Sequence, residues 1–128
     1  MTPKQIVELW IEKFNNADIE GLIELYSVDA INHQVVTHPF KGREEIRKLF
    51  EVDFARAKMV CIPEMIHEAG EWAILEWRDI DPLGLRGCGF FHVQNNQIVF
   101  LCYPGNLLHI SRNTNQMGNQ DNFCSWSD

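Results

Sequence analysis

The stretch WAILEWR, residues 72–78, carries apolar side chains at every second position from Ala73 to Trp77. Alternate residues of a strand lie on one face, so this pattern predicts a strand with one buried face. The flanking stretches EAGE (68–71) and DPLGL (81–85) contain the glycine and proline that turns favour. We therefore expect residues 72–78 to lie inside an antiparallel hairpin series.

Further strands are expected on both sides of this one. Apolar runs separated by turn-forming stretches predict strands over residues 61–67, 72–80, 86–93 and 98–103. Upstream, Thr2 and Gln5 form a capping box for a first helix, and Asp18 caps a second. A third helix is expected over about residues 43–57, and a short strand over 29–36. Three helices followed by a meander predict an α+β domain.

The turns also predict which side chains share a face of the sheet. We close the three hairpins by pairing His67 with Trp72, Ile80 with Arg86, and Val93 with Ile98. These pairings divide the strand residues into two sets, one for each face of the sheet. The more apolar set is expected to face the helices: Ile62, Glu64, Ile66, Ala73, Leu75, Trp77, Asp79, Gly87, Gly89, Phe91, Val93, Ile98, Phe100 and Cys102. The other set forms the expected outer face: Cys61, Met65, Trp72, Ile74, Glu76, Arg78, Cys88, Phe90, His92, Val99, Leu101 and Tyr103. A β-bulge would invert part of this assignment.

The expected outer face is unusually apolar for a solvent-exposed sheet. Such a patch is typical of an interface. We expect a homodimer through this face, with cover by the C-terminal segment around Leu107, Leu108 and Ile110 as the alternative.

Composition limits the function classes. A chain of 128 residues with 45% hydrophobic and 23% charged residues fits one globular domain. The net charge of −7 disfavours nucleic acid as a partner. The apolar runs are far shorter than the roughly 20 residues of a membrane helix, and the N-terminus lacks the pattern of a secretory signal. The cysteines have no metal-ligand spacing, so we expect no metal site, no cofactor, and a reducing, cytoplasmic location.

Several local strings resemble a known superfamily. They are NADIE (16–20) leading to Leu25-Tyr26, DAINHQ (29–34), GREEI (42–46) and WAILEW (72–77). Together they resemble the nuclear transport factor 2-like superfamily, in its SnoaL-like and ketosteroid-isomerase-like branch. The resemblance covers about residues 3–110. It implies a cystatin-like cone, with three N-terminal helices on a curved antiparallel sheet, mixed at the edge, around a pocket. We expect the domain over residues 1–112 and a polar, loose tail over 113–128.

The steroid isomerases of that branch provide a direct comparison of catalytic positions. Their oxyanion-hole tyrosine corresponds to Trp10, their general-base aspartate to Gln34, and their proton-donating aspartic acid to Gly89. None of these residues can take the corresponding role. The resemblance therefore implies the fold and a small-molecule pocket, and disfavours steroid isomerisation by that mechanism.

The pocket implied by the fold has a predicted lining of aromatic and apolar residues with polar groups from the first strand. The alternative is that the aromatic residues fill the cone as core. The expected substrate-binding residues are Trp10, Phe14, Tyr26, Asn32, Leu49, Phe50, Trp77, Phe91 and Phe100.

Three residues are candidates for catalysis. Asp79 is expected on the inner face, where burial raises a carboxyl pKa, although it can also cap the turn that follows. His33 has an imidazole suited to acid–base work, and Gln34 can orient a substrate oxygen. Strand alternation sends only one of His33 and Gln34 inward.

These residues predict a small-molecule-binding protein. If it is an enzyme, we expect cofactor-free proton transfer (isomerisation, cyclisation or dehydration) on an apolar or polyketide-like substrate. The alternative is a non-catalytic ligand-binding or dimeric adaptor module.

Overall fold

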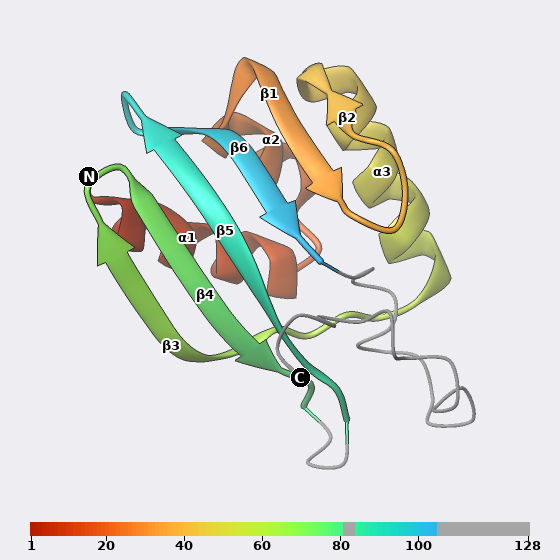
Figure 1. Cartoon of the computed structure of the whole chain (residues 1–128). Coiled ribbons are helices and arrows are strands. Elements are labelled where there is room, and N and C mark those ends of the chain that lie inside the picture. Colours follow the sequence, from red (N-terminus) through yellow and green to blue (C-terminus); the bar gives the residue numbers. More distant parts are fainter. Residues whose placement is uncertain (81–83, 105–128) are drawn as a thin grey trace.

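The computed structural model describes residues 1–80 and 84–104, which form three helices and one six-stranded sheet. Figure 1 shows the helices behind the sheet. The predicted α+β architecture is confirmed. The elements are α1 (Pro3–Asn15), α2 (Ile19–Leu25), β1 (Tyr26–Gln34), β2 (Phe40–Lys41), α3 (Gly42–Arg56), β3 (Ile62–Ala69), β4 (Trp72–Arg78), β5 (Arg86–Gln94) and β6 (Gln97–Tyr103).

Helix α1 begins and packs as its sequence indicates. Thr2 accepts a hydrogen bond from the Gln5 backbone, and the Gln5 side chain accepts one from Thr2 in return. The helix buries one stripe against the sheet, comprising Ile6, Val7, Trp10, Ile11 and Phe14. Trp10 therefore lies in the interior.

Helix α3 carries a buried stripe that includes one acid. Ile46, Leu49 and Phe50 are buried as predicted, and Asp53 lies on the same stripe. Residues three and four apart share a helix face, so Asp53 points inward with Leu49 and Phe50.

The sheet is mostly antiparallel as expected, but its parallel pair lies one strand in from the edge. Its strand order is β2-β1-β6-β5-β4-β3, in which β1 and β6 run parallel and the other neighbours run antiparallel. The parallel pair brings the first strand of the chain beside the last described one. Polar residues at positions 32–34 are thereby placed next to the end of β6.

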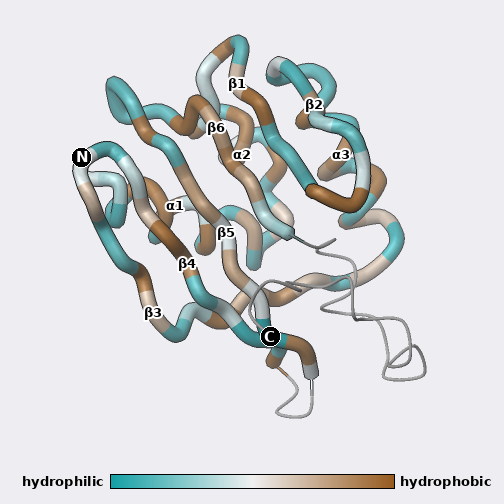
Figure 2. Tube along the Cα trace, in the orientation of Figure 1, coloured by the Kyte–Doolittle hydropathy of each residue, from teal (hydrophilic) through white to brown (hydrophobic). Residues whose placement is uncertain are grey.

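The predicted faces are confirmed on β4 and on the inner side of β5. Ala73, Leu75 and Trp77 are buried, whereas Trp72 and Ile74 are exposed. Figure 2 shows hydrophobic and hydrophilic residues mixed along most strands, as expected of a sheet with helices on one face.

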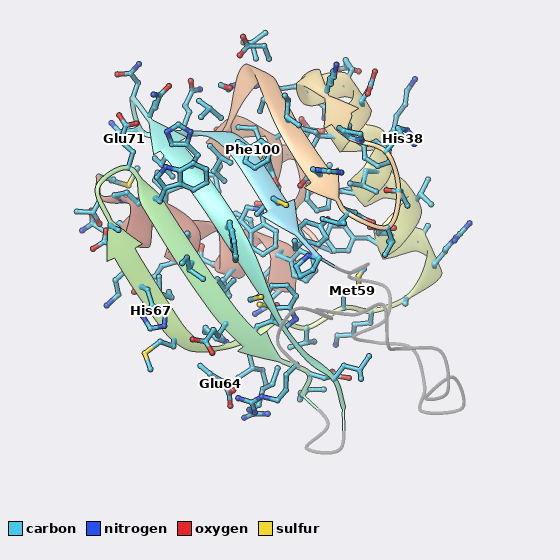
Figure 3. All side chains as sticks on the ribbon, in the orientation of Figure 1. His38, Met59, Glu64, His67, Glu71 and Phe100 are labelled. Carbon is cyan, nitrogen blue, oxygen red and sulfur yellow. The ribbon has the colours of Figure 1, made fainter. Side chains whose placement is uncertain are left out.

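The predicted faces of β6 are wrong beyond its first residues. Val93 pairs with Ile98 as expected, but His92 pairs with Phe100, so Val99 is an extra residue that forms a bulge. The bulge reverses the alternation: Leu101 and Tyr103 are buried. Phe100 and Cys102 lie on the outer face, where the Phe100 ring contacts Trp72 (Figure 3).

The predicted faces are also wrong at the start of β3. Ile62 pairs with the outer-face residue Arg78, and Cys61 just before the strand is buried in the core. Glu64 does not face inward. The β3–β4 pairing shifts between Pro63 and Met65, which places Glu64 in an irregularity. Its carboxylate forms ion pairs with the outer-face residues Arg78 and Arg86. Figure 3 shows Glu64 at the lower end of the sheet.

Two expectations lie outside the described residues. They are the loose tail over residues 113–128 and cover of the outer face by Leu107, Leu108 and Ile110. Within residues 1–80 and 84–104, no helix is long and apolar enough to cross a membrane.

Candidate functional site: a buried polar cluster

Strand β1 directs two amide side chains into the interior. Asn32 lies beside Leu101 of β6 and Gln34 beside Tyr103, and all four side chains are buried. His33 alternates with them and lies beside Cys102, toward the outer face. The alternative left open by the sequence is thereby decided: Gln34, and not His33, points inward.

Gln34 is bonded to a residue that the sequence placed outside. Its Nε2 donates a hydrogen bond of 2.8 Å to the Tyr103 hydroxyl. Because the hydroxyl oxygen accepts this bond, the Tyr103 O–H remains able to donate to a third group. The bulge at Val99 makes this contact possible, since it turns Tyr103 inward.

A second tyrosine is bonded on the helix side. The indole Nε1–H of Trp10 donates to the Tyr26 hydroxyl at 3.0 Å. Tyr26 is fully buried, and burial raises its pKa above the ordinary value despite this bond. Tyr26 therefore stays neutral at physiological pH.

Asp53 and Asp79 are the buried acids among the described residues, and Asp53 is the less exposed of the two. The Asp53 side chain is only 4% exposed, and its Oδ2 has no hydrogen-bond partner among the described residues. Burial raises the pKa of Asp53 to about 6, although the Arg56 charge acts in the opposite direction. A carboxyl with this pKa can both accept and donate a proton near neutral pH.

These side chains share one interior. Burial raises the pKa of Tyr103 well above its usual value, and the charges of Tyr26 and Asp53 raise it further. The hydrogen bond from Gln34 lowers this pKa, as does the Asn32 amide, which lies near the hydroxyl without reaching hydrogen-bonding geometry. Such effects require proximity, so we name these five residues, Tyr26, Asn32, Gln34, Asp53 and Tyr103, the interior polar cluster.

Several buried polar atoms in and near the cluster have no hydrogen-bond partner among the described residues. Neither amide atom of Asn32 meets a described group at hydrogen-bonding geometry, and Nε1 of Trp77 is likewise unpartnered. Each buried unpaired polar group costs about 1–3 kcal/mol. A ligand that offers an oxygen acceptor and a donor would remove this cost.

Aromatic rings pack around the cluster. The ring of Trp10 stacks on Phe14 with 4.9 Å between ring centroids, and it meets Phe91 edge-on with centroids 5.4 Å apart. The ring centroids of Phe50 and Tyr26 are 6.3 Å apart. Apart from Phe100, the residues expected to line a pocket are buried, including Leu49 and Trp77. Their rings contact one another, so part of the predicted lining is packed core.

Asp79 lies at the end of its strand, in the turn. Its Oδ1 accepts a hydrogen bond from the Ile80 backbone at 2.6 Å, and its own N–H donates to the Leu85 carbonyl. This is the turn-capping arrangement that the sequence offered as the alternative to catalysis.

Sequence reasoning missed Asp53 as a site residue. The signal was present, since Asp53 continues the stripe of Ile46, Leu49 and Phe50 on one helix face. Tyr103 carried no comparable signal, because its direction depends on the bulge. No group of three or more potential metal-ligating side chains occurs among residues 1–80 and 84–104.

Comparison with known proteins supports the architecture. The sequence profile of the SnoaL-like domain matches residues 7–101. The chain belongs to the SnoaL-like family. Among curated protein sequences, none matches this SnoaL-like chain significantly.

Solved structures share the SnoaL-like fold at low sequence identity. A putative polyketide cyclase from Pseudomonas putida has a TM-score of 0.72 and 19% identity, covering 85% of this chain and 95% of that one. A putative polyketide cyclase from Sinorhizobium meliloti has a TM-score of 0.70 and 17% identity, covering 77% of this chain and 93% of that one. An LEH-like epoxide hydrolase from M. tuberculosis has a TM-score of 0.68 and 18% identity, covering 83% of this chain and 84% of that one. At such identities the likeness establishes the fold alone.

Proposed function

We propose that this SnoaL-like protein binds a neutral, largely apolar molecule at the interior polar cluster and transfers a proton on it without a cofactor. The observation that carries the proposal is Asp53: its carboxyl is buried, has an unpartnered oxygen and a pKa of about 6. Such a group suits proton transfer near neutral pH.

Each residue of the cluster has a role in this proposal. Asp53 accepts a proton from the ligand and returns it at another position. The Tyr103 hydroxyl and the Asn32 amide donate hydrogen bonds to a ligand oxygen on which negative charge develops. Gln34 fixes the Tyr103 hydroxyl and so positions its proton. Asp53 thus takes the role that the sequence suggested for His33 or Asp79.

A carbonyl compound fits this set of groups. Its oxygen can accept from Tyr103 and Asn32, while its apolar body contacts rings such as Trp10 and Phe50. Two SnoaL-like neighbours are named as putative polyketide cyclases, which is consistent with a ligand that carries a carbonyl group. The reaction class we propose is isomerisation, cyclisation or dehydration.

The outer face of the sheet favours a second role in assembly. Trp72, Ile74 and Met65 are exposed there, and Trp72 stacks on His92 at 4.5 Å. We propose that this face pairs two copies of the chain. If the interior binds no small molecule, a non-catalytic dimeric adaptor explains this structure better than an enzyme does.

The test follows the titration of Asp53 by carbon-detected NMR with a neutral ketone as probe. 2-Heptanone should bind, stabilise the fold against heat by mass action, and change the Asp53 pKa. Asp53→Asn should keep the fold and remove the proton-transfer step, measured as exchange of the ketone's α-hydrogens with deuterium from solvent. Binding without any effect on the Asp53 pKa would contradict the proposed site.

A further inference from the structure

A cleft of about 440 Å³ opens where α1 and α3 end. Residues from both helix ends and from the segment that leads into β3 line it: Asn15, Asn16, Ala17, Phe54, Ala57, Lys58 and Met59. Figure 3 shows Met59 beyond the end of α3.

Phe54 separates this cleft from the interior. Its half-buried side chain lines the cleft. On the inner side, its ring stacks on Phe50 with ring centroids 5.6 Å apart and meets Phe14 edge-on with centroids 5.3 Å apart. Phe50 in turn lies 6.3 Å from Tyr26 of the interior polar cluster. Phe54 also follows Asp53 directly in α3. Two rings therefore separate the cleft from the cluster.

The lining of the cleft mixes polar and apolar groups, since Lys58 and two asparagines lie among its apolar side chains. Both amide atoms of Asn15 are bonded to the Cys61 backbone, at 2.9 and 2.7 Å. The Asn16 amide nitrogen donates to the Glu12 carbonyl at 2.9 Å. Because these three amide atoms are already bonded, an uncharged ligand group would contact chiefly Phe54, Met59 and the alanine side chains, with the charge of Lys58 beside them.

We propose that this cleft is an outer subsite of the ligand site, suited to an uncharged alkyl or ring portion, and that Phe54 sets the length of ligand accepted. A ligand whose oxygen is held at the interior polar cluster ends against the stacked rings of Phe50 and Phe54, of which Phe54 borders the cleft. A longer ligand extends into the cleft only when that ring is displaced or replaced. The inference rests on the proposed function, because it takes the ligand's polar end to lie at the cluster.

A homologous series of neutral ketones tests the inference. The series runs from 2-butanone to 2-undecanone, and ligand-observed NMR gives each Kd. Each further buried CH₂ should strengthen binding about fourfold, which corresponds to about 0.8 kcal/mol. In the unaltered protein this gain should stop at one chain length. In Phe54→Ala it should continue to longer ketones.

Matched variants connect the effect to the cleft. Phe40 is another partly buried phenylalanine, which lines a different hollow at the start of α3, so Phe40→Ala should leave the length limit unchanged. Ala17 lines the cleft with φ of 51°, a conformation that aspartate tolerates. Adding Ala17→Asp to Phe54→Ala should abolish the gain for long ketones and leave short ketones unaffected. If Phe54→Ala does not fold, Phe54→Leu replaces it in the same experiment, with the same expected extension of binding to longer ketones.

The results distinguish two failures. If short ketones bind but the Phe54 variants move the length limit no more than Phe40→Ala, the outer subsite is rejected and the interior site stands. If no ketone of any length binds the unaltered protein, the subsite and the proposed function are both rejected.

Discussion

Gln34 of β1 and Tyr103 of β6 are joined by a buried hydrogen bond of 2.8 Å between residues 69 positions apart in the sequence. The bond lies where the two parallel strands run side by side. It holds the Tyr103 hydroxyl in one orientation, close enough to Asp53 for the charge of that acid to raise the Tyr103 pKa. This contact therefore links the two strands inside the core and fixes the hydroxyl that lies nearest the cluster's amides.

Removing one partner of this bond should cost more than removing both. Tyr103→Phe leaves the buried Gln34 amide unpaired, so we expect a loss of about 1–3 kcal/mol in unfolding free energy. Gln34→Leu in the same background should recover much of that loss. Urea denaturation of the two single variants and the double variant measures the coupling. Strictly additive effects would mean that the bond contributes nothing to stability.

Asp53 should make stability fall as pH rises. Its folded pKa, about 6, is above the ordinary value of 3.8, so the folded state holds the proton more tightly than the unfolded state. Stability from this group is present below about pH 4 and is lost between about pH 4 and 6, by roughly 3 kcal/mol.

The control for this pH effect is Asp53→Asn, which cannot ionise. Relative to the unaltered protein, it should become more stable as pH rises from about 4 to 6, with a constant difference above that range. Denaturation midpoints at a series of pH values measure this difference. A difference that does not change with pH would show that Asp53 titrates normally.

Gly89 should tolerate a methyl group and no more. A Cβ placed there would meet Trp77 at 3.4 Å, and Leu101 and Phe91 at 3.6 Å, which are ordinary contact distances. Gly89→Ala should change stability little, whereas Gly89→Leu should cost about 1–3 kcal/mol through overpacking. Thermal and urea unfolding of both variants measures this. A neutral Gly89→Leu would reveal open space beside Trp77.

The outer face should mediate dimerisation. Ile74 is exposed on β4 beside Trp72, and Ile74→Glu would place an unpaired charge in the interface. Sedimentation equilibrium should show a dimer for the unaltered protein and a monomer for this variant. Val28→Glu changes a valine that is 73% exposed in β1 and should leave the dimer intact. A monomeric unaltered protein at micromolar concentration would end this proposal.

The polar segment over residues 113–128 should be dispensable for stability. It shows no apolar periodicity in the sequence. Deleting it should move the thermal midpoint by only a few degrees, on the scale that about 1 kcal/mol corresponds to roughly 4 °C. A large fall in the thermal midpoint on deletion would mean that the folded domain extends beyond residue 112.

The local elements could be predicted from local physics. The capping box of Thr2 and Gln5 forms as expected, and α3 spans Gly42–Arg56 against an expected 43–57. Alternation correctly placed Ala73, Leu75 and Trp77 inside. Each of these outcomes depends on neighbours within a few residues, and such neighbours are visible in a sequence.

The site depended on longer-range information. Asn32 and Gln34 were among the expected site residues, but strand alternation alone could not say whether Gln34 or His33 points inward. The pairing of β1 with β6 decided it. Asp53 was visible as an acid on an apolar stripe, yet its raised pKa depends on burial by distant parts of the chain.

The sequence by itself determined the helices, the meander and the family to which the chain belongs. Only the tertiary structure decided which polar groups meet inside. The reason is the period of two in a strand: the single extra residue at Val99 turns Tyr103 inward and Phe100 outward. Backbone pairing between strands fixes such a bulge, and the residues of one strand alone do not.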